Sequence, residues 1–252
     1  MWRVTADYHT HTKYSSHSLA AGSIEDNARS ALKAGLDILG IADHGPANWG
    51  HWSLTNLTTF EKIMVETKQV EQALSEIKIL SGVEANIISY DGDLDIPLTL
   101  QRRLDQVLAG FHPTVFPKLY GEGVKYAARL ALSGISLGWR QKARNENTKA
   151  VIEAVYRNEI DIITHPGHKI SIDTPELARA CARTDTALEI NSKHGAASVG
   201  FIKAAALEGV RFAIGSDAHR PQQVGQLYPG VRAAQIAGLR ADQIINVCEV
   251  PG

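Results

Sequence analysis

Short apolar runs alternate with amphipathic stretches along the whole chain. The runs have the length of strands and are apolar on both faces, as buried parallel strands are. They predict seven strands, at about residues 4–10, 37–43, 77–84, 105–111, 160–164, 186–191 and 211–216. Between them, the 3.6-residue period of surface helices predicts helices at residues 23–35, 58–76, 147–158 and 197–209.

The first predicted helix has clear signals at both ends. Ser23 suits the N-cap, with Asp26 three residues later, and Gly35 suits the C-cap. Because strands and helices alternate, we expect parallel pairing through right-handed crossovers. Seven such units predict an α/β fold, a TIM-like barrel that lacks one unit. An open doubly wound sheet is the alternative.

Histidines and carboxylates gather where the apolar runs end. Nine of them are potential metal ligands: His9, His11, His17, His44, Glu84, His112, His165, Asp217 and His219. The carboxyl ends of barrel strands meet at one face, so we expect these side chains to converge there. An open sheet fits less well, because its outer strands lie too far apart to bring all of them together.

The spacing of these residues favours metal binding. His9 and His11 are two residues apart on a strand, which places both imidazoles on one face. Asp43 precedes His44 directly, and such a carboxylate either binds metal or orients a ligand. Glu84 ends an apolar run, where a buried carboxylate needs a partner, and its two oxygens can bridge two ions.

Histidine and carboxylate ligands without thiolates suit zinc, manganese or iron and argue against calcium. At roughly three to four protein ligands per ion, nine suffice for two or three ions. Such clusters suit phosphate ester hydrolysis, because one ion can lower the pKa of bound water to about 7 and others can hold phosphate oxygens.

The overall composition excludes several classes of protein. The chain of 252 residues fits a single domain, and its net charge of −1 provides no field for nucleic acid or an anionic membrane. We find no membrane-spanning stretch and no signal peptide. Cys181 and Cys248 lie far from the ligand runs and are typical of reduced thiols. We therefore expect a cytoplasmic protein without a membrane partner.

One strongly basic region interrupts this pattern, at about residues 113–146. Within residues 118–149 there are seven basic and two acidic side chains. Two interpretations stay open: a solvated helical insertion in the single domain, or a basic lid over an anionic substrate.

Seven segments together resemble the PHP (polymerase and histidinol phosphatase) superfamily, and within it the YcdX-type phosphatases. They are DYHTHTKYSSHS, GIADHGP, GVEANI followed by DGDLD, AGFHPTVF, ITHPGH, LEINSKHG and GSDAH, between residues 7 and 219. The resemblance implies a distorted (β/α)7 barrel with three divalent metal ions, Zn, Mn or Fe.

The resemblance also implies how the ligands are shared. The first ion would be held by His9, His11, Glu84 and Asp217, and the second by Glu84, His112 and His165. The third would be held by His17, His44 and His219. Among these, Glu84, Asp217 and His219 would act in catalysis. Four further residues are candidates for contacts with phosphate: Lys169, Lys193, His194 and Arg220.

We therefore expect a metal-dependent phosphomonoesterase that acts on a small-molecule phosphate ester through metal-bound hydroxide. Histidinol phosphatase and an exonuclease-like phosphodiesterase are the enzymatic alternatives, and a metal-binding sensor or scaffold is the non-enzymatic one. A nucleic-acid partner is not expected, and a homo-oligomer stays open.

Overall fold

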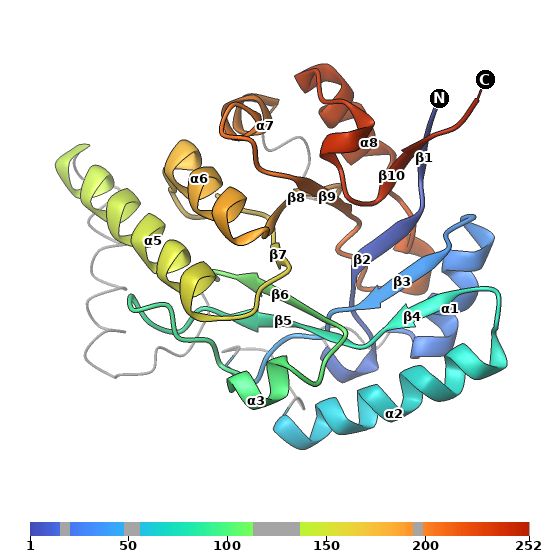
Figure 1. Cartoon of the computed structure of the whole chain (residues 1–252). Coiled ribbons are helices and arrows are strands. Elements are labelled where there is room, and N and C mark those ends of the chain that lie inside the picture. Colours follow the sequence, from blue (N-terminus) through green and yellow to red (C-terminus); the bar gives the residue numbers. More distant parts are fainter. Residues whose placement is uncertain (16–20, 48–55, 113–136, 194–198, 252) are drawn as a thin grey trace.

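The computed structural model describes residues 1–15, 21–47, 56–112, 137–193 and 199–251 (Figure 1). Its main strands form two parallel sheets. The three-stranded sheet consists of β2 (Ala6–Thr10), β3 (Ile38–Ile41) and β4 (Lys78–Leu80). The five-stranded sheet consists of β5 (Gly82–Asn86), β6 (Gln106–Gly110), β7 (Ile162–Ile163), β8 (Ala187–Asn191) and β9 (Phe212–Gly215).

Two seams join these sheets into a closed ring. Beyond β3 the chain runs beside β5, where the backbone N–H of Gly45 donates to the carbonyl of Glu84 at 2.9 Å. Beyond β2 and β9, the N–H of His11 donates to the carbonyl of Ala218 at 2.7 Å. The expected distorted TIM-like barrel is confirmed, and the open doubly wound sheet is excluded.

One predicted strand, 77–84, is in fact two strands that belong to different sheets. The break falls at Ser81, whose backbone N–H and hydroxyl both donate to the carboxylate of Asp105, at 3.0 and 2.6 Å. Because Asp105 takes this N–H, the strand ladder is interrupted there. The break lets β4 pair with β3 while β5 pairs with β6.

Alternation along the strands determines what fills the barrel. One level holds apolar side chains that pack together: Ala42, Leu108, Ile162, Ala187 and Ala213. Two residues further along the chain, on the same inward faces, stand His44, Gly110, Thr164, Glu189 and Gly215. A polar level therefore lies directly above the apolar one, at the carboxyl ends of the strands.

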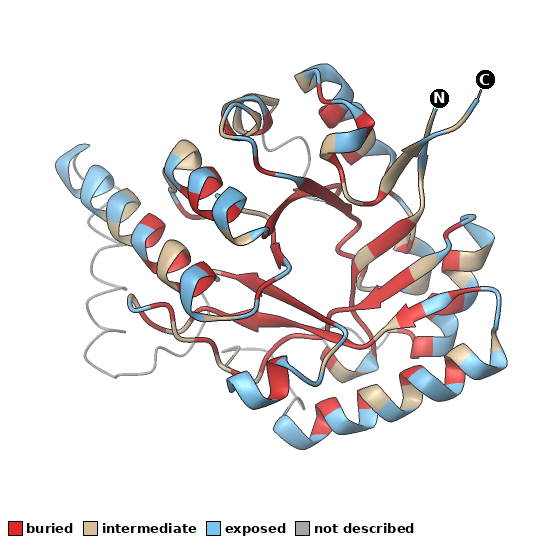
Figure 2. Ribbon diagram, viewed as in Figure 1, coloured by how far each residue is buried: buried red, intermediate tan, exposed pale blue. Residues whose placement is uncertain are grey.

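Helices cover the outside of the barrel and turn their apolar faces toward it (Figure 2). The predicted helices are present as α1 (Ile24–Lys33), α2 (Leu57–Ala73), α5 (Leu137–Arg157) and α7 (Val199–Ala206). The structure adds α3 (Leu98–Gln101), α6 (Thr174–Thr184) and α8 (Tyr228–Ala237). Short 3₁₀ turns are η1 (Lys13–Ser15), η2 (Pro221–Gln223) and η3 (Ala241–Gln243).

Helix α1 has the predicted N-terminal cap. The Ser23 hydroxyl accepts from the N–H of Asp26 at 3.1 Å, and the Asp26 carboxylate accepts from the N–H of Ser23 at 2.9 Å. Gly35 follows the helix with φ 75°, which suits glycine. None of the described helices is both long enough and apolar enough to span a membrane.

Helix α5 begins ten residues before its predicted start at 147. Its first turns are exposed or half-buried, including Leu137 and Trp139, so they show no apolar stripe from which a helix could be predicted. The last part of the basic region is thus helical, whereas residues 113–136 lie outside the described residues.

The two ends of the chain lie side by side (Figure 1). Strand β1 (Trp2–Val4) pairs with β10 (Val247–Glu249) in an antiparallel two-stranded sheet that the sequence did not reveal.

Candidate metal centre

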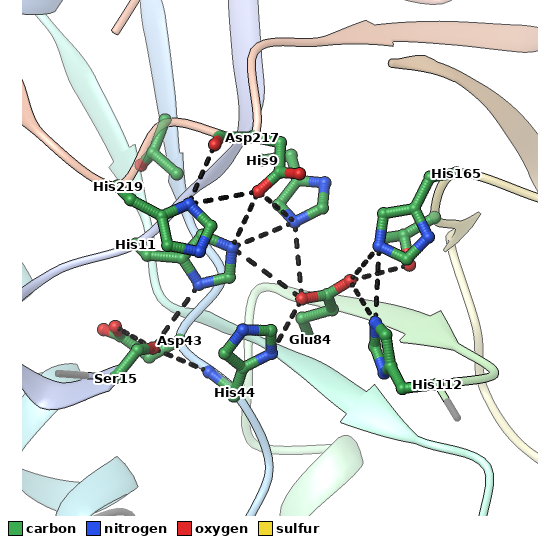
Figure 3. Close-up of polar contacts among 12 residues, drawn as sticks. His9, His11, Ser15, Asp43, His44, Glu84, His112, His165, Asp217 and His219 are labelled. Atoms are coloured by element: carbon green, nitrogen blue, oxygen red, sulfur yellow. Dashed lines mark hydrogen bonds and ion pairs between the residues drawn. The ribbon is translucent and has the colours of Figure 1, made fainter. Parts of the chain in front are cut away.

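Eight of the nine candidate ligands converge at the carboxyl ends of the barrel strands (Figure 3). They come from both sheets. In sequence they extend from β2 to the segment that follows β9. His17, the ninth, lies outside the described residues. The predicted convergence is therefore observed for every candidate ligand that the structure describes.

Glu84 lies at the centre of this cluster and is only 1% exposed. Its Oε1 atom lies 3.0 Å from His165 Nε2 and 3.3 Å from His112 Nε2. Its Oε2 atom lies 2.8 Å from His44 Nδ1 and 3.5 Å from His9 Nε2. The two oxygens of one carboxylate thus face two separate groups of imidazoles.

Among the described residues, three groups have ligand atoms within 4.8 Å of one another. They are His9, His11 and Glu84; Glu84, His112 and His165; and His11, His44 and His219. Asp217 adjoins the first group, with Oδ1 3.4 Å from His11 Nε2 and 3.9 Å from His9 Nε2. The grouping follows the expected one, except that His11 also lies beside His44 and His219.

Two distances between ring nitrogens match metal coordination. His9 Nε2 lies 3.2 Å from His11 Nε2, and His112 Nε2 lies 3.3 Å from His165 Nε2. Two nitrogens bound tetrahedrally to one zinc ion at about 2.05 Å would be about 3.3 Å apart. In addition, the buried Glu84 Oε2 atom faces ring nitrogens of three histidines, His44 at 2.8 Å, His9 at 3.5 Å and His11 at 3.7 Å. These side chains therefore fit divalent metal ions.

The protonation of the cluster also suits metal ions. Burial and the charges of His219 and His44 hold the pKa of His11 well below its usual value, and burial lowers the pKa of His44. Burial alone would raise the pKa of Glu84, but the surrounding imidazoles lower it far below its usual value. Neutral imidazoles and a charged carboxylate are the forms that bind metal.

His9 is the exception in this cluster. Burial acts to lower the pKa of His9, but the charges of Glu189, Glu84 and Asp217 outweigh it and raise the pKa well above its usual value. A metal ion therefore competes with a proton more strongly at His9 than at His11 or His44.

Two supporting residues were missed in the sequence. Glu189 lies 2.7 Å from His9 Nδ1, and the Asn86 side-chain carbonyl lies 2.8 Å from His112 Nδ1. Each contact leaves Nε2 of the histidine facing the centre. Glu189 could have been found, because LEIN, like GVEAN, is an apolar run that carries a carboxylate.

Asp43 does not reach the cluster of ligand atoms. Its carboxylate accepts from the backbone N–H of Thr12 at 2.8 Å, from the Thr12 hydroxyl at 2.7 Å and from the Ser15 hydroxyl. Ser15 Oγ in turn accepts from the N–H of His44 at 2.8 Å. Of the two roles considered for Asp43, the contacts favour orientation of the loops that carry ligands.

The candidate phosphate contacts differ in position. Lys193 Nζ lies at the cluster, 3.0 Å from His219 Nδ1 and 3.5 Å from Asp217 Oδ1. Lys169 and Arg220 are exposed, and their side chains form no hydrogen bond or ion pair with any described residue. His194 lies outside the described residues.

The family model for the PHP domain matches residues 7–219. A protein of Thermoanaerobacter sp. strain X514, named a probable phosphatase, is 32% identical over 97% of this chain and 91% of its own length. Another probable phosphatase, from Acetivibrio thermocellus, is 31% identical over 89% of this chain and 83% of its own length.

A solved structure has the same fold. It is the histidinol phosphate phosphatase of Lactococcus lactis, in complex with zinc, L-histidinol and phosphate, with a TM-score of 0.61 over 94% of each chain. At 16% identity this likeness bears on the fold alone. The family model and the similar sequences confirm the resemblance, and the chain belongs to the PHP-domain family.

Proposed function

We propose that this chain is a phosphomonoesterase with a site for three divalent metal ions, and that its substrate is a small-molecule phosphate ester. The chain is a metal-dependent phosphatase, as its relatives and its clusters of histidines and carboxylates indicate. The number of ions and the preference for monoesters are the proposal. The observation that carries it is the position of Glu84, whose two oxygens each face a different group of imidazoles.

We assign the ligands as follows. Glu84 would be shared by the first and second ions. His9, His11 and Asp217 would complete the first site, and His112 and His165 the second. His44 and His219, together with His17, would hold the third ion. The close approach of His11 to His44 and His219 supports a third site beside the first.

When bound, the ions would supply Lewis acidity that activates water for attack on phosphorus and neutralises charge on the phosphate. The side chains set the geometry for this chemistry. The Asp217 carbonyl lies 2.9 Å from His219 Nδ1, which directs His219 Nε2 toward the site. Asp217 itself has φ 53°, an uncommon conformation for a residue other than glycine. With Glu84 and His219, it forms the proposed catalytic set.

Lys193 is the best-placed cation for the substrate phosphate. Its ammonium group already lies beside Asp217 and His219, so a phosphate at the ions would come within its reach. Lys169, Arg220 and His194 are further proposed phosphate contacts. Lysine and arginine side chains near the ions would favour a dianionic monoester over a diester, which carries one negative charge fewer.

The test compares substrates after the metal has been removed and restored. Chelator-treated protein should not hydrolyse p-nitrophenyl phosphate, and added Mn²⁺ or Zn²⁺ should restore hydrolysis. Bis(p-nitrophenyl) phosphate should react far more slowly, and faster diester cleavage would favour the phosphodiesterase alternative. Histidinol phosphate in the same panel tests the histidinol phosphatase alternative. Full metal content without hydrolysis of any ester would favour the sensor or scaffold.

A further inference from the structure

A second buried carboxylate, Glu189, lies behind the ligands rather than among them. It stands on the inward face of β8 and is 3% exposed. Its Oε1 atom lies 2.7 Å from His9 Nδ1. Its Oε2 atom accepts from the backbone N–H of His165 at 2.7 Å and from the Asn191 amide at 3.1 Å. One carboxylate thus contacts residues proposed to hold two different ions.

The space for Glu189 depends on a glycine. A Cβ atom built on Gly215 would overlap Glu189 Oε1, and it would lie 3.1 Å from the Cβ of His9. Only a residue without a side chain therefore leaves room for the carboxylate between β9 and the His9 ring. The motif GSDAH carries this glycine two residues before Asp217.

The backbone of His165 has an uncommon conformation, which a strong acceptor for its N–H would stabilise. His165 has φ 27°, a positive value that is uncommon for a residue other than glycine. Gly167 and Lys169 nearby also have positive φ values, of 83° and 61°. A charge-assisted hydrogen bond to Glu189 stabilises this conformation. The same bond fixes where the His165 ring meets Glu84.

We infer that Glu189 is a positioning residue that orients His9 through its ring and His165 through its backbone, and so couples the first and second ions. This inference rests on the proposed metal ligands. Its tests measure zinc binding and ring tautomers, not hydrolysis, so its failure would leave the phosphatase proposal standing.

The conservative variant Glu189→Gln separates the two contacts. An amide has one acceptor oxygen and one donor nitrogen. Two donors, from His165 and Asn191, meet at Oε2, so the amide oxygen should settle there and the NH₂ should face His9 Nδ1. That arrangement selects the His9 tautomer with hydrogen on Nε2, which cannot bind metal through Nε2.

Nitrogen-15 NMR of the histidine rings reads the tautomer directly. In the zinc-loaded wild-type protein, His9 should carry its hydrogen on Nδ1. In E189Q, recorded at a pH where the ring is neutral, the hydrogen should be on Nε2. A hydrogen on Nε2 of His9 in the zinc-loaded wild-type protein would overturn the inference, whether or not E189Q folds.

Titration of metal-free protein with Zn²⁺ against a chelating dye tests the coupling. Glu189→Ala removes both contacts and should bind two ions more weakly, by about 10- to 100-fold, whereas E189Q keeps the acceptor for His165 and should weaken only the ion at His9. The matched variant is Asn86→Ala, because Asn86 orients only His112 among the candidate ligands, so its loss should be confined to one ion. Wild-type affinity for all ions in a folded Glu189→Ala variant, or a loss confined to one ion in that variant, would overturn the coupling.

Discussion

The carboxylate of Glu84 is a buried charge that needs compensation. It is 1% exposed and has five imidazoles around it, three of them near Oε2. A buried charge of this kind is unfavourable unless cations or hydrogen bonds compensate for it. Thr164 supplies one hydrogen bond, at 2.8 Å to Oε1. The proposed ions would supply the remaining compensation.

Replacement of Glu84 should therefore remove two ions together. We expect Glu84→Ala to bind one ion where the wild-type protein binds three, because the first and second sites lose their shared ligand. Metal content after gel filtration, by plasma mass spectrometry, measures this. Glu61→Ala is the control, since Glu61 is an exposed glutamate that pairs with Arg103, and it should keep all ions. Loss of a single ion from E84A would disprove the bridge.

The buried thiol of Cys181 gives a second prediction at this scale. Burial raises the pKa of Cys181 to about 12, so almost no thiolate, the reactive form, is present at pH 8. Cys248 is half-buried. A disulfide reagent at pH 8 should modify Cys248 in the folded protein and reach Cys181 only in denaturant. Rapid modification of both thiols in folded protein would show that the core around α6 opens readily.

The site residues that could be predicted from the sequence were those whose side chains can bind metal. Histidines and carboxylates after apolar runs identified eight described residues that converge. Glu189 stands in an apolar run as Glu84 does and could have been found in the sequence, whereas Asn86 is not a metal ligand and gave no such signal. Both act by orienting another side chain across the barrel, and such contacts join residues that are distant in sequence.

At the scale of elements, the helices and strands that could be predicted were those with a clear difference between apolar and polar positions. The apolar cores of the barrel strands were evident, and so was α1 with its capping box. Helix α8 was not predicted, because its buried residues are Gly230, Ala233 and Ala234, which give little contrast. The break between β4 and β5 was not predicted either, because it depends on the distant side chain of Asp105.

Gly92 shows how closely two elements approach. Its φ is 79°, and a Cβ there would overlap the backbone of Glu153 and Ala154 in α5. The left-handed conformation alone costs a residue other than glycine about 1–2 kcal/mol. Gly92→Ala should therefore lower the free energy of unfolding by more than this amount. Gly209→Ala is the matched control, with φ 76° and no atom within 4 Å. Urea unfolding compares them, and equal losses would contradict the tight contact.

For the whole molecule, the candidate metal ligands lie at both seams of the barrel. Glu84 lies opposite His44 at one seam, and His9 and His11 lie beside Asp217 and His219 at the other. Ions bound by these residues would link the sheets across each seam. Binding to the folded state alone stabilises it.

Metal should therefore raise the unfolding temperature. At 100 times its dissociation constant, one ion adds about 2.7 kcal/mol, which corresponds to about 5–10 °C for a chain of this size. Calorimetry with Zn²⁺ and with a chelator measures the difference. Glu84→Ala should reduce the shift. An unfolding temperature that is independent of metal would mean that the ions do not link the sheets.

The break at Ser81 has a consequence for how the chain could be divided. Among the described strands, the chain passes between the two barrel sheets only there, so each sheet is formed by a continuous piece of sequence. The first piece carries His9, His11 and His44, and two of the three ligand groups need residues from both pieces. Fragments cut at Ser81 should therefore act as a zinc-dependent complementation pair, associating more tightly with zinc than with a chelator.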